Sequence, residues 1–173
     1  MRTNFIVIFF ILNLLTACFS QKTEQEKINY TIENAESVLP RSVSLVNDFS
    51  SVFTMDEKKE LENLLKEFSD KTTNQIAIVT VDYILPYNNI QDYTTDLGNF
   101  WGIGKKGKDN GLVIVLNMQN REVRIGTGFG TEKILSEAFL KTVIDDKMIP
   151  YFKENQFYKG MHLGIDEIIK NWK

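Results

Sequence analysis

Two short runs of apolar and β-branched residues, at 76–81 and 112–116, stand out because they contain almost no polar position. Runs of this length without alternation are typical of strands that are covered on both faces of a sheet. Residues 121–125 alternate instead, with apolar side chains at Val123 and Ile125. This alternation predicts a third strand that is less covered than the other two.

Segments with helical spacing of apolar residues lie between and after these strands. Thr54, with Glu57 three residues later, forms a capping-box signature before the first of them. The spacing that follows predicts a helix running to about Phe68. Further helical segments are predicted over residues 89–101, 133–147 and 158–172, and in a short stretch after Pro150.

The order strand, helix, strand, hairpin and helices predicts an α/β sandwich with a small mixed sheet. A right-handed crossover makes the first two strands parallel, and a tight turn at 117–120 makes the third antiparallel. This topology brings the loops at 102–111 and 126–132 to one edge of the sheet. Asp82 and Asn120 are expected at the opposite end.

The N-terminal part of the chain has a different character. A single positive charge, Arg2, precedes an apolar run at 5–15, which is shorter than the about 20 residues that a membrane-spanning helix needs. The run has the length of a signal-peptide core. It ends in Leu-Thr-Ala-Cys at 15–18, which resembles the bacterial lipobox, so Cys18 is the predicted lipidation site.

Cysteine usage agrees with this interpretation, because Cys18 is the one cysteine of the chain and no internal disulfide can form. We therefore predict a cleaved signal at 1–17, a lipidated cysteine with a flexible tether at 18–42, and one domain at 43–173. The expected location is the cell envelope, lipid-anchored to a membrane on its periplasmic or outer-surface side. An ordinary secretory signal and an uncleaved anchor are the alternatives.

Charge and loop composition exclude two classes of partner. The whole chain has a net charge of −3, and removal of the signal with Arg2 makes it −4, which does not suit nucleic-acid binding. Residues 102–109 almost match the phosphate-binding loop GxxxxGK followed by Ser or Thr. However, Asp109 replaces the hydroxyl residue, and the loop precedes a strand instead of a helix. No nucleotide is therefore expected as a partner.

Carboxylates and glycines are the remaining candidates for chemistry. Calcium takes six to eight oxygen ligands, and the Asp-Asn-Gly sequence at 109–111 offers several, although it is also a common turn. Glycines at 126–130 allow the backbone to approach an ion closely, or simply to turn. His162 is the one histidine and lies on an amphipathic segment, so no zinc site is predicted. The candidate carboxylates are Asp48, Asp109, Glu132, Asp145 and Asp146.

These segments together resemble the TPM domain family, which includes thylakoid-lumen, photosystem II repair and acetylcholine-receptor-modulator-like proteins. The resemblance extends over about 43–172 and rests on Val46-Asn47-Asp48, residues 75–81, Trp101-Gly102-Ile103-Gly104, residues 109–112 and 121–128, Glu132, residues 144–145 and 149–152, Gly160 and Gly164. It implies a three-layer α/β/α sandwich, export to a membrane, and a site for a divalent cation, commonly calcium, with magnesium as the alternative. By position, the ligands would be Asp48, Asp109, Asn110, Glu132 and Asp145.

The resemblance implies two functions. In the first, the membrane-anchored domain binds the cation and acts as an interaction, assembly or repair accessory with a protein partner in the envelope. In the second, it is a metal-dependent acid phosphatase in which the ion activates water. The chain has no DxDxT or DxDxV motif for a phosphorylated nucleophile, and Arg121 opens the third strand at the far end from the loops. We therefore favour the first function.

Overall fold

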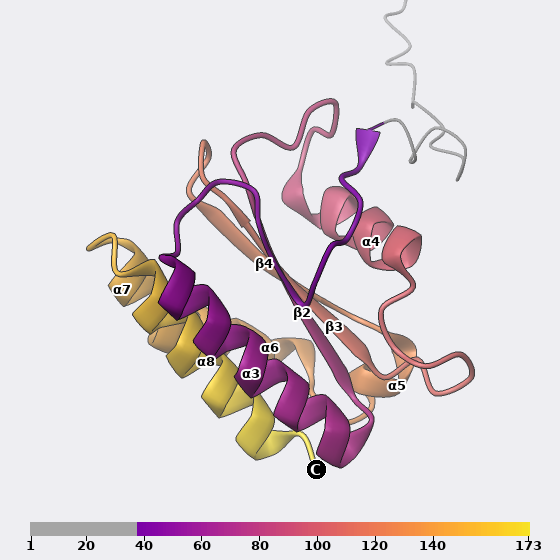
Figure 1. Ribbon diagram of the computed structural model, residues 1–173. Helices are drawn as coiled ribbons and strands as arrows, with labels where there is room; N and C mark the ends of the chain where they lie inside the picture. Colours follow the sequence, from indigo (N-terminus) through magenta and orange to yellow (C-terminus); the bar gives the residue numbers. More distant parts are fainter. Residues whose placement is uncertain (1–37) are drawn as a thin grey trace, which may run out of the picture. The chain divides into compact units, whose positions relative to one another are not determined.

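The computed structural model describes residues 38–173, which form a four-stranded mixed sheet with helices on both faces (Figure 1). The strand order is β1-β2-β3-β4. β1 and β3 are parallel to β2, whereas β4 is antiparallel to β3, as predicted for the three longer strands. β1 was not predicted, because three residues are too few to show a periodic pattern. The strands are β1 (Val46–Asp48), β2 (Gln75–Val81), β3 (Gly111–Asn117) and β4 (Glu122–Thr127).

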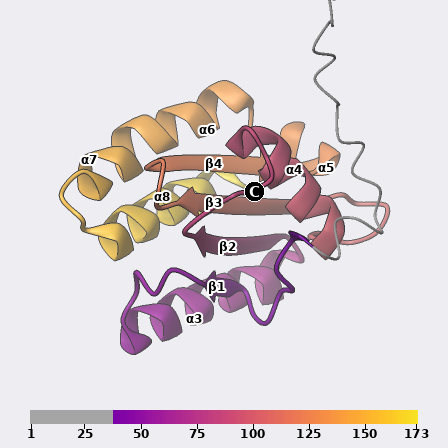
Figure 2. The same ribbon diagram turned by 90° about the horizontal axis from the view of Figure 1, so that it is seen from above.

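The helices complete the three layers that the resemblance implied. α4 (Ile90–Trp101) covers one face of the sheet, and α3 (Met55–Thr72) and α8 (Phe157–Asn171) cover the other (Figure 1). α6 (Glu137–Val143) lies beyond β4 when the sheet is seen from above (Figure 2). The remaining elements are α5 (Phe129–Glu132), the π-helical turn η1 (Ile144–Met148) and α7 (Ile149–Phe152).

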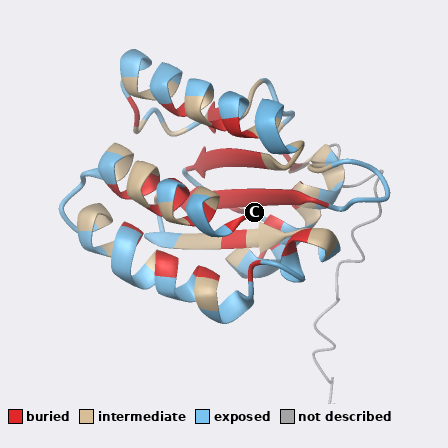
Figure 3. Ribbon diagram, turned by 90° about the horizontal axis from the view of Figure 1, so that it is seen from below, coloured by how far each residue is buried: buried red, intermediate tan, exposed pale blue. Residues whose placement is uncertain are grey.

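Burial follows the sequence patterns closely. Every residue of β3 is buried, and so is β2 after Gln75, as the unbroken apolar runs predicted (Figure 3). α3 begins with the predicted capping box, in which Glu57 N donates to Thr54 Oγ1 and Thr54 N donates to Glu57 Oε2. The last helix buries Met161, Ile165 and Ile168, and Trp172 is buried just after it.

The helix predicted over 133–147 is interrupted. Ser136 starts α6 by accepting a hydrogen bond from Phe139 N at 3.2 Å, and the helix passes into a π-helical turn at Ile144. This turn places Met148 against α8, where a Cβ on Gly164 would lie 2.2 Å from Met148 Cε. Helical periodicity does not reveal such a turn, because the extra residue in it is local.

The domain begins earlier than residue 43. Leu39 is 4% exposed, and Trp101 Nε1 donates a hydrogen bond of 2.7 Å to the carbonyl oxygen of Pro40. The last residues of the predicted tether therefore contact α4. The predicted signal, Cys18 and the tether up to residue 37 lie outside the described residues. Between residues 38 and 173, no helix combines the length and apolar character that a membrane crossing requires.

Candidate functional site

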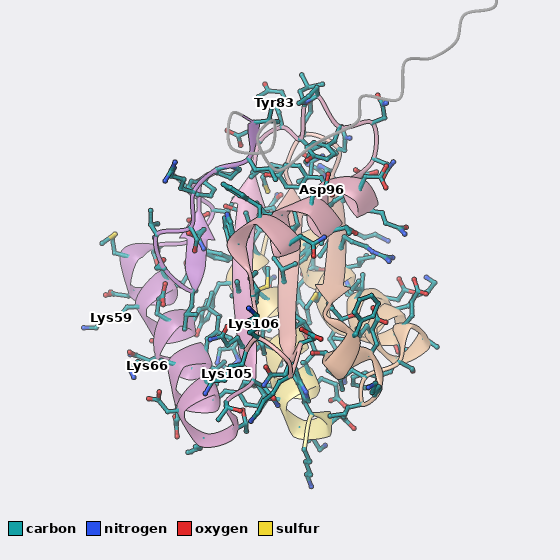
Figure 4. All side chains as sticks on the ribbon, turned by 90° about the vertical axis from the view of Figure 1, so that its right-hand side faces the viewer. Lys59, Lys66, Tyr83, Asp96, Lys105 and Lys106 are labelled. Atoms are coloured by element: carbon teal, nitrogen blue, oxygen red, sulfur yellow. The ribbon has the colours of Figure 1, made fainter. Side chains whose placement is uncertain are left out.

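A long groove follows β4, which is the last strand of the sheet. We call it the β4 groove. It has a volume of about 1780 Å³, with α4 forming one wall and the segment from α6 to α7 forming the other. One end includes the loop of Lys105 and Lys106, which Figure 4 shows below α4 and far from Tyr83 at the opposite end of the sheet. The groove therefore includes the sheet edge at which the sequence placed the candidate site.

The two glycine-containing loops meet at this edge, as the topology predicted. Gly128 N donates to Gly111 O at 2.9 Å, and Gly130 N donates to Asp109 O at 3.0 Å. A Cβ on Gly130 would lie only 1.9 Å from Lys108 O, and one on Gly128 would lie 2.3 Å from Asp109 O. The glycines are thus needed for contact between the two loops. From the sequence alone, they could either have brought the backbone close to an ion or have formed a turn.

Asn110 fixes this loop. Its Oδ1 accepts from Lys105 N at 2.9 Å, and its Nδ2 donates to Thr73 O at 3.0 Å and to Asn74 Oδ1 at 2.9 Å. The side chain is buried. These hydrogen bonds hold the loop in place, and the ligand role of Asn110 stays a prediction, because its oxygen has a second lone pair.

Asp48 lies at the opposite end of the sheet. It pairs with Thr80 near the end of β2, whereas Asp109 precedes β3, whose first residue pairs with the first residue of β2. The Asp48 carboxylate accepts from Val52 N at 3.1 Å, from Phe53 N at 3.0 Å and from the Thr80 hydroxyl. The expectation that Asp48 lies beside the other ligands is therefore wrong, because parallel pairing separates the two ends.

The other predicted ligands line the β4 groove but are not equally free. Asp109 and Glu132 are exposed there, and Thr127 Oγ1 lies 3.4 Å from Glu132 Oε1. Asp145 forms an ion pair of 2.6 Å with Lys141. Within the part of the chain that the structure describes, no group of three or more Asp, Glu, His or Cys side chains is arranged to hold a metal. The predicted five-residue ligand set is not assembled.

The groove also contains charged residues that sequence reasoning did not assign to it. Arg124 on β4 reaches Glu137 at the start of α6, with 3.2 Å between Nη2 and Oε1. Arg121 lines the far end, in the left-handed region at φ 53°. The signal for this surface was the hairpin itself. β4 follows β3 through a hairpin, and the rest of the chain after β4 is helical. No later strand is therefore available to pair with β4, so β4 is expected to be the edge of the sheet.

His162 lies outside this groove, on α8. Its Nδ1 is 3.1 Å from Asp166 Oδ2, and its ring packs edge-on against Tyr158 with centroids 5.7 Å apart. Tyr158 donates a hydrogen bond to Glu60, and this bond raises the pKa of Tyr158 to about 12, with burial and nearby carboxylates adding to the shift. The cluster joins α8 to α3, in agreement with a structural histidine.

Comparisons with known proteins agree with this fold. The N-terminal domain of a P. gingivalis protein has a TM-score of 0.68 and 28% identity, covering 82% of this chain and 90% of that domain. The BA42 protein from the psychrophilic bacterium Bizionia argentinensis has a TM-score of 0.62 and 18% identity, covering 72% and 88%. The N-terminal domain of the cg2496 protein from Corynebacterium glutamicum has a TM-score of 0.59 and 11% identity, covering 79% and 87%.

The last two likenesses concern the fold alone. The comparison with curated proteins gives no significant match. A family model, described as the TPM domain, matches residues 46–171, which include all four strands and the helices from α3 to α8. The chain belongs to the TPM domain family.

Proposed function

We propose that this TPM domain is an interaction module of the bacterial cell envelope, held at a membrane by a lipid on Cys18, and that a divalent cation assists its binding. The observation that supports the proposal is the β4 groove, which is far larger than a single ion requires and runs beside an edge strand. Concave surfaces are the usual places for ligands, and this one combines apolar residues with many polar and charged ones, as a protein-binding surface does.

The residues of the groove fit a cation in part. Asp109 and Glu132 offer two carboxylates, and Thr127 offers a hydroxyl. Within residues 38–173, no third acidic side chain lies where it could join these two in holding a metal ion. Mg²⁺ is commonly held by one or two carboxylates with several waters, and Ca²⁺ also accepts waters. Asp109 and Glu132 would thus hold an ion that provides a positive charge for a carboxylate or phosphate oxygen of a partner.

Calcium or magnesium is expected to stabilise the domain through these two residues. A cation at roughly a hundred times its dissociation constant adds about 2.7 kcal/mol to the free energy of unfolding. Thermal unfolding of the chain, with and without each ion, measures this gain. Asp109→Asn and Glu132→Gln should each remove most of it, because both keep the side-chain shape and lose the charge.

Asp146→Asn is the matched control. Asp146 is exposed on η1 and does not line the groove, so this variant should keep the full gain. An absence of stabilisation by both ions would contradict the cation part of the proposal. Equal stabilisation of Asp109→Asn, Glu132→Gln and Asp146→Asn by the ions would also contradict it.

The alternative function, a metal-dependent acid phosphatase, has less support from the geometry. His162 is paired with Asp166 on α8, and Arg124 is paired with Glu137. Hydrolysis of p-nitrophenyl phosphate at acidic pH tests this function directly. Turnover that requires calcium or magnesium and falls in Asp109→Asn, with Asp146→Asn unaffected, would favour the phosphatase over the interaction module.

The anchor is tested by the N-terminus of the mature protein. When the full chain is produced in a bacterial host, mass spectrometry should find a first residue of Cys18 carrying acyl chains, and the protein should enter the membrane fraction. Stable anchoring is expected because each buried methylene contributes about 0.8 kcal/mol and several chains act together. Cys18→Ser should abolish acylation, whereas Ser20→Ala should retain it. A mature chain that begins elsewhere, without acyl chains, would rule out the lipoprotein assignment.

A further inference from the structure

The pairing of β3 with β4 identifies which main-chain groups point out of the sheet. Gly128 N donates to Gly111 O, so these two residues form a hydrogen-bonded pair. In an antiparallel ladder such pairs alternate with non-bonded pairs. Arg124 and Gly126, at the same parity as Gly128, therefore direct their N–H and C=O groups toward β3. The intervening residues, Val123, Ile125 and Thr127, direct theirs to the free edge.

These outward groups lie in the β4 groove, whose lining includes all three residues. Among residues 38–173, no hydrogen bond outside the sheet ladder joins their main-chain N–H or C=O groups to another residue. An unpaired edge of this kind is a template for another strand, and proteins usually blunt it or cover it. Here helices form walls on either side of the edge, and the edge itself is left open.

We propose that the β4 groove binds an extended peptide segment of a partner protein, which pairs with β4 as a fifth strand of the sheet. This inference rests on the proposed interaction function and names its ligand class. Main-chain hydrogen bonds to Val123, Ile125 and Thr127 would hold the peptide, and the two walls of the groove would select its side chains.

The two walls differ in chemistry. The α4 wall presents Gln91, Thr95 and Asn99, which are exposed and uncharged. The opposite wall presents the apolar residues Ala138, Ile144 and Ile149 together with the charged residues Glu137, Lys141 and Asp145. Glu137 is paired with Arg124, and Lys141 is paired with Asp145, so the apolar side chains of this wall are the ones left to contact a ligand. Side chains of a strand alternate between the two faces of a sheet. A matching peptide therefore alternates polar uncharged residues, toward α4, with apolar residues, toward α6 and α7.

The charges of the groove favour the same ligand. Its lining contains five cationic and five acidic side chains, so their sum is zero. Two of the cations, Arg124 and Lys141, are already paired with Glu137 and Asp145. A lining that is neutral without the cation does not attract a polyanion, which suits a peptide of low net charge with at most one carboxylate at the ion held by Asp109 and Glu132. A second copy of the chain is a less suitable ligand than an isolated peptide strand. The β4 of a second copy is flanked by its own α4 and α6, which would collide with the walls of the groove.

Proline at an outward position tests the pairing. Val123→Pro removes one outward N–H donor but no donor of the β3–β4 ladder, and proline is tolerated at such edge positions. Val123→Ala is the matched control, because it loses the same side-chain packing and keeps the N–H group. The probe is a displayed library of random peptides about eight residues long, on the order of 25 Å when extended, selected on the full chain carrying Cys18→Ser.

The selected peptides should show the predicted alternation. They should bind Val123→Pro about tenfold more weakly than Val123→Ala, the effect of losing one well-formed hydrogen bond. Hydrogen exchange on the chain with native β4 gives a second measurement that does not depend on a proline variant. Peptide binding should slow exchange at the amides of Val123, Ile125 and Thr127. The amides of Arg124 and Gly126 should be protected already.

Ala138→Arg separates failure of this inference from failure of the proposed function. Ala138 is exposed on the groove wall, so arginine there should obstruct part of the groove beside β4 without disturbing the core. Suppose that peptide binding is lost in Ala138→Arg but is equal in Val123→Pro and Val123→Ala. This result would overturn strand pairing, but it would still support the β4 groove as the binding surface. Binding unaffected by all three substitutions, or no selected peptide, would overturn both. Self-association of the chain that Val123→Pro abolishes would assign the edge to a second copy.

Discussion

Gly111→Ala is expected to lower the free energy of unfolding by about 3 kcal/mol or more, toward the upper end of what overpacking costs. A Cβ at this position would lie 2.1 Å from the carbonyl oxygen of Ile103 and 2.8 Å from Gly104 N. Both are main-chain atoms, so no side chain can move aside. Gly111 is also buried, and its carbonyl accepts hydrogen bonds from Gly128 N and the Thr131 hydroxyl. Urea denaturation of the variant measures the loss.

Gly107→Ala provides the comparison within the same loop. Gly107 has φ +80°, but a Cβ added to it would meet no atom within 4 Å, so only backbone strain of about 1 kcal/mol is expected. The two variants separate a steric requirement from a conformational one. A Gly111→Ala protein that is as stable as Gly107→Ala would show that the start of β3 does not lie as close to Ile103 and Gly104 as this contact requires.

Asp48→Asn should destabilise the domain by about 2–4 kcal/mol, to the same extent with and without calcium. The carboxylate accepts two main-chain hydrogen bonds, from Val52 and Phe53, together with one from Thr80. An amide nitrogen cannot accept, so the substitution leaves a partly buried donor unpaired and weakens the others. Thermal and urea unfolding in the two ionic conditions measure the change.

Asp82→Asn is the control for this prediction. Asp82 is exposed and follows β2 at the same end of the sheet, so its replacement should change stability by no more than about 0.5 kcal/mol. If Asp48→Asn were harmless without calcium and abolished stabilisation by calcium, Asp48 would be a ligand after all. The structural role assigned to it here would then be wrong.

Much of the fold could be predicted from local patterns. The unbroken runs at 76–81 and 112–116 identify buried strands because burial on both faces leaves no polar position, and the Thr54–Glu57 box identifies the start of α3. β1 and the π-helical turn at Ile144 could not be predicted in the same way. A three-residue strand has no period, and the extra residue of the turn leaves no repeating signal in the sequence.

The candidate site was predicted only where it depends on topology. The antiparallel third strand correctly brought the loop after β4 to Asp109. Asp48 and Asn110 were assigned by their place in a family pattern, which contains no information on the hydrogen bonds each side chain makes. Asp48 holds the loop after β1, and Asn110 holds the loop before β3. The groove itself depends on the strand order, which no single segment determines.

The contact between Trp101 and Pro40 has a mechanical consequence. Leu39 and Pro40 are the first residues, counted from the N-terminal side of the described chain, that are fixed to the domain. Tension applied to the chain at residue 38 would reach the last turn of α4, through Pro40 and Trp101, before it reached β1. Because α4 is one wall of the β4 groove, such a pull would load a helix of the groove before it loaded the sheet.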